Sequence, residues 1–231
     1  MRRSSVFVLL LFLFVSVVQS AAQQEYVSRY DAFVGYSYLN SPKLSLSQNG
    51  FHTQFGVNAY SWAALGVDFS YFNGSSTLHT TDLNSTQLAK LAPIAPLLPP
   101  GYVIQSPYDA TTYTITGGPQ FSIRKFKQVT IFVRPSFGAM HESVTAKPGD
   151  PIMTQIVAGL IGPSMKKTDT EMFYGAGGGV DLNFSRHLAV RAQVDFVRVG
   201  LFTDLVTGSQ NNIRFSIGPT FRFGKNIQKP F

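Results

Sequence analysis

The sequence predicts an all-β protein: an eight-stranded antiparallel up-and-down transmembrane β-barrel with short periplasmic turns and long outer loops. Three observations predict this fold. Apolar and polar residues alternate with a period of two in successive segments along the chain. Most of these segments have about nine to thirteen residues, the length of a tilted membrane strand. The connections between them alternate in length, as they do in outer-membrane barrels.

Residues 1–22 have the features of a signal peptide. Arg2 and Arg3 precede an apolar run at 6–18 that is too short to span a bilayer, and small residues follow it. Cleavage after Ser20 and cleavage after Ala22 both satisfy the small-residue rule. We therefore expect export to the bacterial outer membrane, with residues 23–231 forming one barrel domain. The chain has no cysteine, so its stability cannot depend on disulfides.

The alternation places each strand in order. It is clearest near the end of the chain, where Phe215 and Ile217 alternate with Arg214 and Ser216. We expect strands at 31–39, 51–60, 65–71, 111–123, 129–141, 172–182, 188–200 and 212–223.

The connections divide into two groups. Those at 61–64, 124–128 and 184–187 are short, whereas 72–110 and 142–171 are long, and 40–50 and 201–211 are moderate. Soluble sandwiches do not generally separate short from long connections in this way. Strand length, turn alternation and the export signal therefore favour apolar residues facing lipid and polar residues facing inward. A water-soluble barrel would have the reverse arrangement.

The inward faces of the predicted strands carry four acidic and four basic residues. They could line an ion path, but we favour a charge-balanced, hydrogen-bonded plug, because eight strands enclose a lumen that side chains fill. The histidines are scattered without ligand spacing, so we expect no metal and no cofactor. The eight charged residues are Asp31, Asp68, Arg134, Asp181, Arg191, Asp195, Arg214 and Arg222.

The outward aromatic residues gather near the strand ends, where rings prefer the headgroup region. The expected girdles comprise Tyr30, Tyr60, Trp62, Phe121, Phe221 and Phe223 on the turn side, and Tyr38, Phe51, Tyr71, Phe72 and Phe202 on the loop side. Pro119, Pro135 and Pro219 lie on predicted strands although a closed barrel has no free edge. Bulges or interfacial positions would accommodate Pro119 and Pro219, whereas the pattern offers no such account of Pro135.

The end of the last strand reads polar-x-Gly-x-x-aromatic-x-aromatic, with Ser216, Gly218, Phe221 and Phe223 at these positions. With the segments 30–39 and 175–197, this motif resembles the small outer-membrane β-barrel family, the OmpA-like eight-stranded transmembrane barrels. The resemblance covers about residues 26–223. It implies that the barrel-insertion machinery reads the motif as an assembly signal. In this chain residues 224–231 follow the motif, whereas the signal usually ends a chain.

The sequence is compatible with three functions: a structural or surface-interaction role without catalysis, which we favour, a small-solute channel, and a lipid A-modifying hydrolase. The hydrolase would use His141 and Ser143, which share one face of a strand like the His-x-Ser pair of outer-membrane lipid A deacylases. The asparagine that follows the serine in that family is Val144 here, and no acid partner is evident.

The expected partners are outer-membrane lipid and lipopolysaccharide, the insertion machinery, and a surface ligand of the loops 72–110 and 142–171. The loop sequences 88–103 and 151–167 are too apolar for freely solvated loops. Three arrangements of these loops are open: they pack on each other as a cap, enter the outer leaflet or bind a partner. In the second loop we expect a short helix at 152–161. Lysine and arginine are dispersed despite the net charge of +7, so we expect no nucleic acid.

Overall fold

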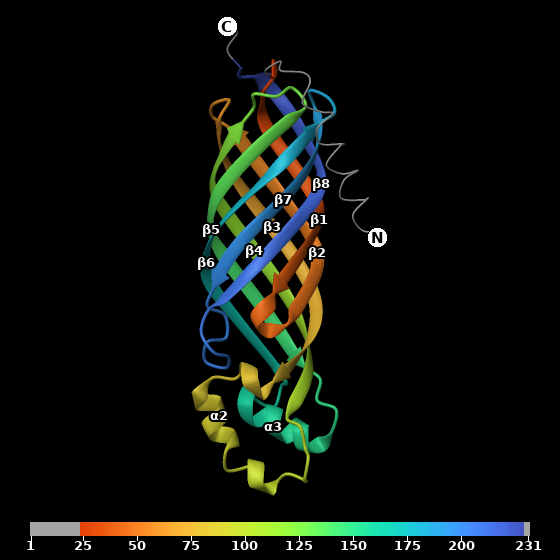
Figure 1. Cartoon of the computed structure of the whole chain (residues 1–231), viewed down its shortest axis with the longest axis vertical. Helices are drawn as coiled ribbons and strands as arrows, with labels where there is room; N and C mark the ends of the chain where they lie inside the picture. Colours follow the sequence, from red (N-terminus) through yellow and green to blue (C-terminus); the bar gives the residue numbers. More distant parts are fainter. Residues whose placement is uncertain (1–23, 229–231) are drawn as a thin grey trace, which may run out of the picture.

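The computed structural model describes residues 24–228. Residues 1–23, which include the expected signal peptide at 1–22, and residues 229–231 at the end of the tail lie outside the described residues. Eight antiparallel strands form a closed barrel in which each strand pairs with the next and β8 pairs with β1, which confirms the expected fold class (Figure 1). The strands are β1 (Ser28–Ser41), β2 (Leu46–Asn58), β3 (Ala63–His79), β4 (Gln105–Ile123), β5 (Val129–Ala146), β6 (Lys166–Asn183), β7 (Leu188–Val199) and β8 (Gln210–Asn226).

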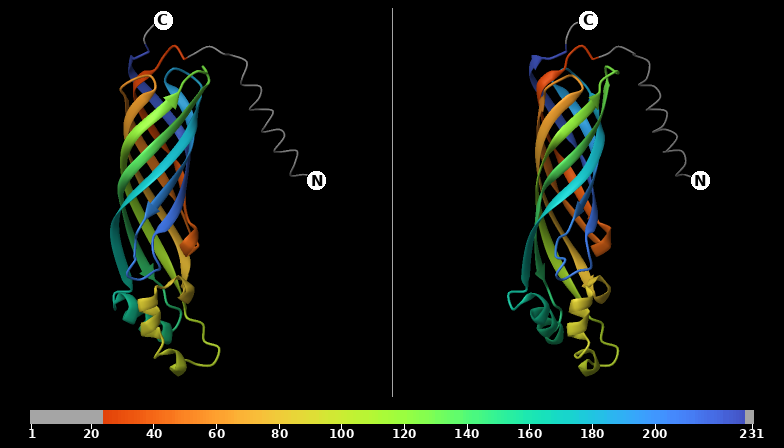
Figure 2. Two further views of the ribbon diagram at one scale, coloured as in Figure 1. Left: turned by 60° about the vertical axis from the view of Figure 1, so that its left-hand side comes forward. Right: turned by 90° about the vertical axis from the view of Figure 1, so that its left-hand side faces the viewer.

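The two ends of the barrel differ, as Figure 2 shows. The turn end carries both ends of the described chain and the short connections 59–62, 124–128 and 184–187. The loop end carries all the helices of the described residues. These are the 3-10 helices η2 (Pro42–Leu44), η3 (Thr80–Asp82) and η4 (Ala95–Leu97), and the α-helices α2 (Ser85–Leu91) and α3 (Pro151–Ile161). Among the described residues, none of these helices is long and apolar enough to cross a membrane.

The strands at the loop end extend well beyond their expected limits. β3 and β4 remain paired as far as His79 and Gln105, and β5 and β6 as far as Thr145 and Lys166. The expected loops 72–110 and 142–171 were therefore too long, and the connections span 80–104 and 147–165. Hydroxyl, amide and charged residues dominate these extensions, so the apolar alternation that locates strands is lost there. The expected helix at 152–161 is confirmed as α3.

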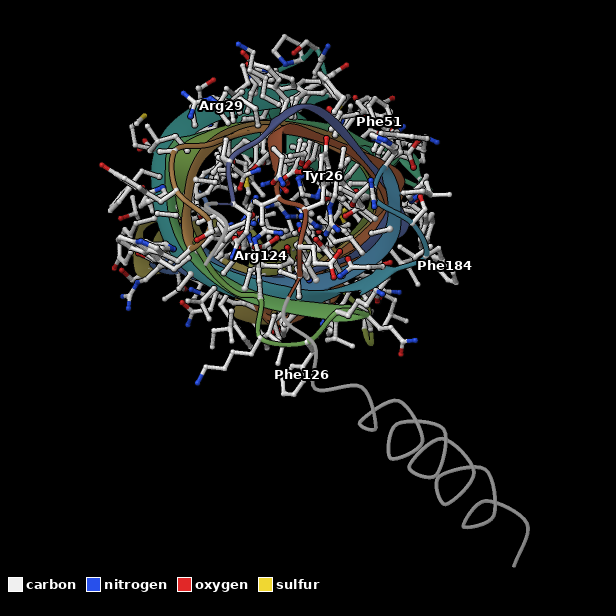
Figure 3. The ribbon with its side chains drawn as sticks, turned by 90° about the horizontal axis from the view of Figure 1, so that it is seen from above. Tyr26, Arg29, Phe51, Arg124, Phe126 and Phe184 are labelled. Atoms are coloured by element: carbon white, nitrogen blue, oxygen red, sulfur yellow. The ribbon has the colours of Figure 1, made fainter. Side chains whose placement is uncertain are left out.

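The barrel is polar inside and apolar outside. On β4, Thr116 points inward and is 2% exposed, whereas its neighbour Ile115 points outward and is 66% exposed. The same alternation leaves Val67 and Phe215 exposed and buries Ser70 and Ser216. Figure 3, seen along the barrel, shows side chains from opposite walls meeting inside the ring of strands. This distribution is the reverse of a water-soluble barrel and matches the expected orientation of the two faces.

The three strand prolines are accommodated by gaps in the strand pairing and not by bulges. Between β4 and β5, pairing stops after Gly117↔Phe137 and resumes in the same register at Phe121↔Val133. Pro119 and Pro135 both lie in this gap, and each keeps its pairing to the strand on its other side. Pro219 lies in a similar gap between β8 and β1 and pairs with β7. Because proline lacks an amide hydrogen, two prolines that share one gap interrupt the barrel wall only once.

Aromatic side chains form a stacked row on the outer surface near the turn end. Trp62 lies between Tyr60 and Phe121, with ring centroids 5.8 and 6.1 Å away. Two aromatic residues expected in the loop-side girdle are elsewhere. Phe72 is 0% exposed because it lies on the inner face of β3, and Phe202 is 3% exposed because it packs among the loops. When the end of a strand is predicted wrongly, an aromatic residue near that end cannot be assigned to the inner or the outer face of the barrel.

Candidate functional site

All eight charged residues expected inside the barrel lie there, and none is more than 6% exposed. Burial of so many charges is costly unless each is paired and hydrogen-bonded. Their side chains form two layers, one near the turn end and one in the middle of the barrel. The first layer contains Asp31, Asp181, Arg191 and Arg222, and the second contains Asp68, Arg134, Asp195 and Arg214.

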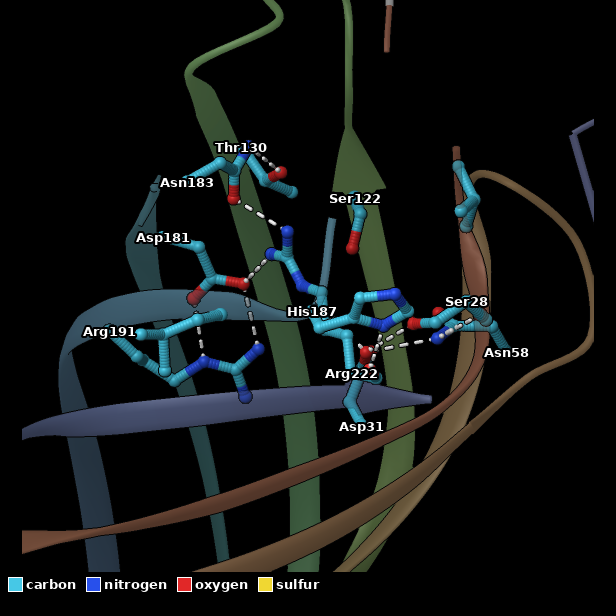
Figure 4. A network of polar contacts seen from close by, with 12 residues as sticks. Ser28, Asp31, Asn58, Ser122, Thr130, Asp181, Asn183, His187, Arg191 and Arg222 are labelled. Carbon is cyan, nitrogen blue, oxygen red and sulfur yellow. Dashed lines mark hydrogen bonds and ion pairs between the residues drawn. The ribbon is translucent and has the colours of Figure 1, made fainter. Parts of the chain in front are cut away.

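In the layer near the turn end, Asp181 receives two arginines (Figure 4). Arg191 donates from Nε to Oδ1 at 2.7 Å and from Nη2 to Oδ2 at 3.0 Å, and Arg222 donates from Nη2 to Oδ2 at 2.8 Å. Arg191 also donates from Nη1 to Oε1 of Gln54 at 2.9 Å, which joins β7 to β2 across the lumen. Asp31 accepts a hydrogen bond from Asn58 at 2.7 Å. The layer therefore ties opposite walls together.

In the middle layer two aspartates alternate with two arginines. Arg134 of β5 contacts both Asp68 of β3 and Asp195 of β7. Arg214 of β8 donates from Nη2 to Oδ2 of Asp195 at 2.9 Å and lies 3.5 Å from Oδ1 of Asp68. Each arginine thus spans two carboxylates from different strands. Charge-assisted hydrogen bonds of this kind are the strong ones in a low-dielectric interior.

His52 joins the middle layer, and sequence reasoning missed it. Its ring is 0% exposed, and Nε2 lies 3.4 Å from Oδ1 of Asp68. The side-chain amide of Gln193 lies 3.1 Å from Nδ1, so an amide hydrogen donated to Nδ1 leaves the ring hydrogen on Nε2, facing Asp68. The sequence did indicate its position, because His52 lies two residues before Gln54 and therefore on the same inner face of the strand.

The side chains of both layers are closely packed. The cavity beside Asp31, Gln54 and Arg191 has a volume of about 10 Å³, roughly that of one water molecule. At Gly177 even a methyl group would not fit, because a Cβ atom there would lie 1.9 Å from Oδ1 of Asp195. Arg124 covers the turn end, donating from Nε to the Ser61 carbonyl at 2.9 Å. The geometry therefore favours the plug over an open ion path.

The connections at the loop end pack together into one unit, which we call the cap (residues 42–45, 80–104, 147–165 and 200–209). Its buried apolar core includes Leu83, Ile156 and Phe202, one from each of the three longer connections. The backbone of Asn84 donates to the Leu205 carbonyl at 3.0 Å, and Lys167 of β6 forms an ion pair with Asp204 at 2.6 Å. This arrangement corresponds to the loop-on-loop cap that the apolar loop sequences suggested.

Helix α3 is held in the cap through its first turn. The carboxylate of Asp150 accepts hydrogen bonds from the Met153 amide at 2.9 Å and from the Tyr102 hydroxyl at 2.8 Å. The Met153 amide, followed by the Tyr102 hydroxyl, holds the pKa of Asp150 below its usual value. Asp150 therefore joins α3 to the connection between β3 and β4.

The outer tip of the cap exposes apolar side chains. Leu97 is 81% exposed and Val103 is 65% exposed, and Leu88 and Ile94 are partly exposed, at 42% and 37%. These residues lie on α2, on η4, between these two helices and in the segment after them, at the end of the molecule farthest from the turn end (Figures 1 and 2). Single exposed apolar residues are ordinary, but several on one short segment are typical of a contact surface.

His141 and Ser143 lie on the outward face of β5, as expected. The Nδ1 atom of His141 lies 2.7 Å from the hydroxyl of Thr170, its partner on β6. Ser143 is opposite Thr168 in the same register, and among residues 24–228 no hydrogen bond joins it to His141. A general base needs contact with its nucleophile, and here a threonine occupies that position. The described residues also contain no group of three or more His, Cys, Asp or Glu side chains that could hold a metal.

The residues of the expected assembly signal lie on both faces of β8. Ser216 points inward, and its hydroxyl lies 2.8 Å from that of Ser37 on β1. Gly218 lies where β8 and β1 approach closely, since a Cβ atom there would be 2.2 Å from the Val34 carbonyl oxygen. Phe221 and Phe223 point outward and are 48% and 44% exposed. Ser216 and Gly218 therefore also have structural roles in closing the barrel.

A closed, inside-out antiparallel barrel with a plugged lumen defines a membrane-barrel protein of the outer-membrane type. The family model described as outer membrane protein beta-barrel domain matches residues 7–225, and the chain belongs to this family.

Among solved structures, the neisserial surface protein A (NspA) is 12% identical, with 84% of this chain and 96% of that chain covered and a TM-score of 0.52. The outer membrane protein OprG from Pseudomonas aeruginosa is 9% identical, with 88% and 100% covered and a TM-score of 0.53. At these identities the likeness shows the fold of small outer-membrane barrels and nothing finer. Comparison with curated protein sequences gives no significant match.

Proposed function

We propose that this protein is a surface-interaction protein of the bacterial outer membrane, in which a plugged barrel carries a rigid cap outside the cell. The turn end faces the periplasm and the loop end faces outward, as the lengths of the connections suggest. The main support for this function is that the loops form one packed core while Leu97 and Val103 remain exposed at the tip of the cap. A cap with its own core can present an apolar surface without collapsing around it.

The barrel itself serves as a scaffold in this proposed function. Ion pairs join β3, β5, β7 and β8 across the lumen, and such a network supports the cap on a stiff base. The hydrogen bond between His141 and Thr170 supports a function without catalysis by His141 and Ser143.

A location in the outer membrane implies two further partners. Outer-membrane lipid and lipopolysaccharide surround the exposed apolar band that includes Val67, Ile115 and Phe215. The insertion machinery reads the signal at Ser216, Gly218, Phe221 and Phe223 during assembly, after an N-terminal signal peptide has directed export. The outward position of both phenylalanines supports their recognition before the barrel enters lipid.

Adhesion of whole cells to hexadecane tests the apolar contact directly. Cells that express the protein should partition into hexadecane more strongly than cells without it, and Leu97→Asp with Val103→Asp should abolish the difference. The control is Thr86→Asp with Gln155→Asp, which adds the same charge at exposed polar positions of the cap. Proteolysis of intact cells measures how much of each variant is at the cell surface, and cells with equal amounts are compared. Equal partitioning of the two variants would contradict the proposed contact surface.

A further inference from the structure

The two ends of the barrel differ sharply in surface charge. Among residues 24–228, the exposed and half-buried charged residues of the turn end include a single acid, Glu25. Arg124 is half-buried there but lies inside the ring of strands; the other cations, which we call the basic rim, are Arg29, Lys125, Lys127, Arg186 and Lys225. At the loop end the solvent-accessible charges balance, six against six. They are Lys43, Lys90, Lys147, Lys166, Lys167 and Arg198 against Asp82, Asp109, Asp150, Asp169, Glu171 and Asp204.

The two sets of cations also differ in pairing. At the loop end Lys147 forms an ion pair with Asp109, and Lys167 forms one with Asp204. At the turn end, by contrast, no member of the basic rim forms an ion pair within residues 24–228. Arg29 donates only to the Asn58 carbonyl, at 3.0 Å. An unpaired cluster of one sign attracts counter-charge from outside the protein.

Apolar rings lie beside the cations of the basic rim. Phe126 lies between Lys125 and Lys127, and Phe184 precedes Arg186 by two residues; their rings are 39% and 70% exposed. Figure 3 shows both phenylalanines outside the ring of strands, whereas Arg124 lies inside it. Rings directed outward from the wall of a membrane barrel occupy the boundary between headgroups and acyl chains. The neighbouring ammonium and guanidinium groups then lie at the depth of lipid phosphates.

We propose that the basic rim binds the headgroups of anionic phospholipids, so that the barrel gathers a shell of acidic lipid in the leaflet at its turn end. The alternation of cation and ring favours lipid over a soluble polyanion, because a soluble partner would leave Phe126 and Phe184 in water. The balanced loop end creates no comparable attraction. Acidic lipid would therefore be recruited on one side of the membrane only.

Trp62 makes the test direct, since it is the only tryptophan of the chain and lies in the outer aromatic row at the turn end. The chain from residue 23 is refolded into vesicles of phosphatidylcholine and phosphatidylglycerol in equal amounts. One preparation carries bromine on the acyl chains of phosphatidylglycerol, the other on those of phosphatidylcholine. Bromine quenches a tryptophan that it contacts. Because the label occupies both leaflets, the direction of insertion does not matter.

Quenching of Trp62 should be stronger with brominated phosphatidylglycerol, and the difference should shrink at high salt. One basic residue near an anionic membrane surface contributes about 1 kcal/mol of attraction. This corresponds to about fivefold enrichment of the anionic lipid over the neutral lipid beside that residue. The variant Lys125→Gln, Lys127→Gln, Arg186→Gln keeps only Arg29 and Lys225 of the basic rim, so the difference in quenching between the two lipids should be much smaller. The matched control Lys90→Gln, Lys166→Gln, Arg198→Gln removes the same three charges at the loop end and should keep the preference. Equal quenching in the unmodified protein, or a preference that is undiminished in the first variant, would overturn the proposal.

Discussion

The guanidinium of Arg191 and the carboxylate of Asp181 face each other in a bidentate pair inside the barrel, at 2.7 and 3.0 Å. The same carboxylate accepts a hydrogen bond from Arg222 at 2.8 Å. One aspartate therefore neutralises part of the charge of two buried arginines. The pair holds β6 against β7 and, through Gln54, connects them to β2 on the far wall.

Asp181→Asn should destabilise the barrel strongly, because it leaves Arg191 and Arg222 buried with less compensating charge. Removal of one partner of a buried ion pair typically costs about 3–5 kcal/mol. The free energy of unfolding by urea in lipid vesicles measures the effect. Arg198→Gln, at an exposed outward position, is the control and should change the stability little. If Asp181→Asn lowers the free energy of unfolding by less than about 1 kcal/mol, the charged layer near the turn end is dispensable for stability.

The unmodified protein should produce no stepwise conductance in planar bilayers, because the paired side chains of the two charged layers join opposite walls of the lumen. Arg134→Ala with Arg214→Ala removes both guanidiniums that fill the middle of the lumen, and conductance steps should then appear. Regular steps from the unmodified protein would instead favour the small-solute channel.

Gly35 and Gly218 occupy the same close approach of β1 and β8, where a Cβ atom would lie 2.4 and 2.2 Å from a backbone carbonyl oxygen of the facing strand. Alanine at either position should lower the stability of the refolded barrel by about 1–3 kcal/mol. Only Gly218 belongs to the expected assembly signal. Gly218→Ala should therefore reduce insertion in living cells more than Gly35→Ala does, as measured by heat-modifiable gel migration of outer-membrane fractions. An equal reduction would limit Gly218 to its packing role.

The alternation of residues predicted the strands and their faces, and so predicted eight of the charged residues that lie inside. It missed Glu142, which is 3% exposed on the inner face of β5, because the expected strand ended at residue 141. It did not predict the ends of β3 to β6 at the loop end, because residues such as Asn73 and Thr168 carry no apolar stripe where the strands extend beyond the apolar band. The composition of the cap was apparent from its apolar loops. Its packing was not, because contacts such as the bridge between Leu83 and Val206 join segments far apart in the sequence.

The cap should loosen in acid through Asp150. The pKa of this carboxylate in the folded protein lies below its ordinary value, so its contribution to stability is fully present above the ordinary value and is lost as the pH falls through the folded pKa. Hydrogen exchange of the Met153 amide should therefore accelerate in strong acid relative to a reference amide in the barrel wall. Asp150→Asn should accelerate that exchange already at neutral pH and remove the acid-dependent step. A step that persists in this variant would assign the titration to another group.

The central claim is that the apolar face of every strand contacts lipid while the polar face lines a filled interior. Because the chain has no cysteine, single nitroxide labels can be placed at Ile115→Cys and Thr116→Cys, neighbours on β4 with opposite faces. In vesicles, collisions with oxygen report lipid and collisions with a water-soluble nickel chelate report solvent. The account predicts frequent oxygen collisions and few nickel collisions at position 115, and few of either at position 116. Frequent nickel collisions at position 115, or restricted collisions of both kinds there, would contradict it.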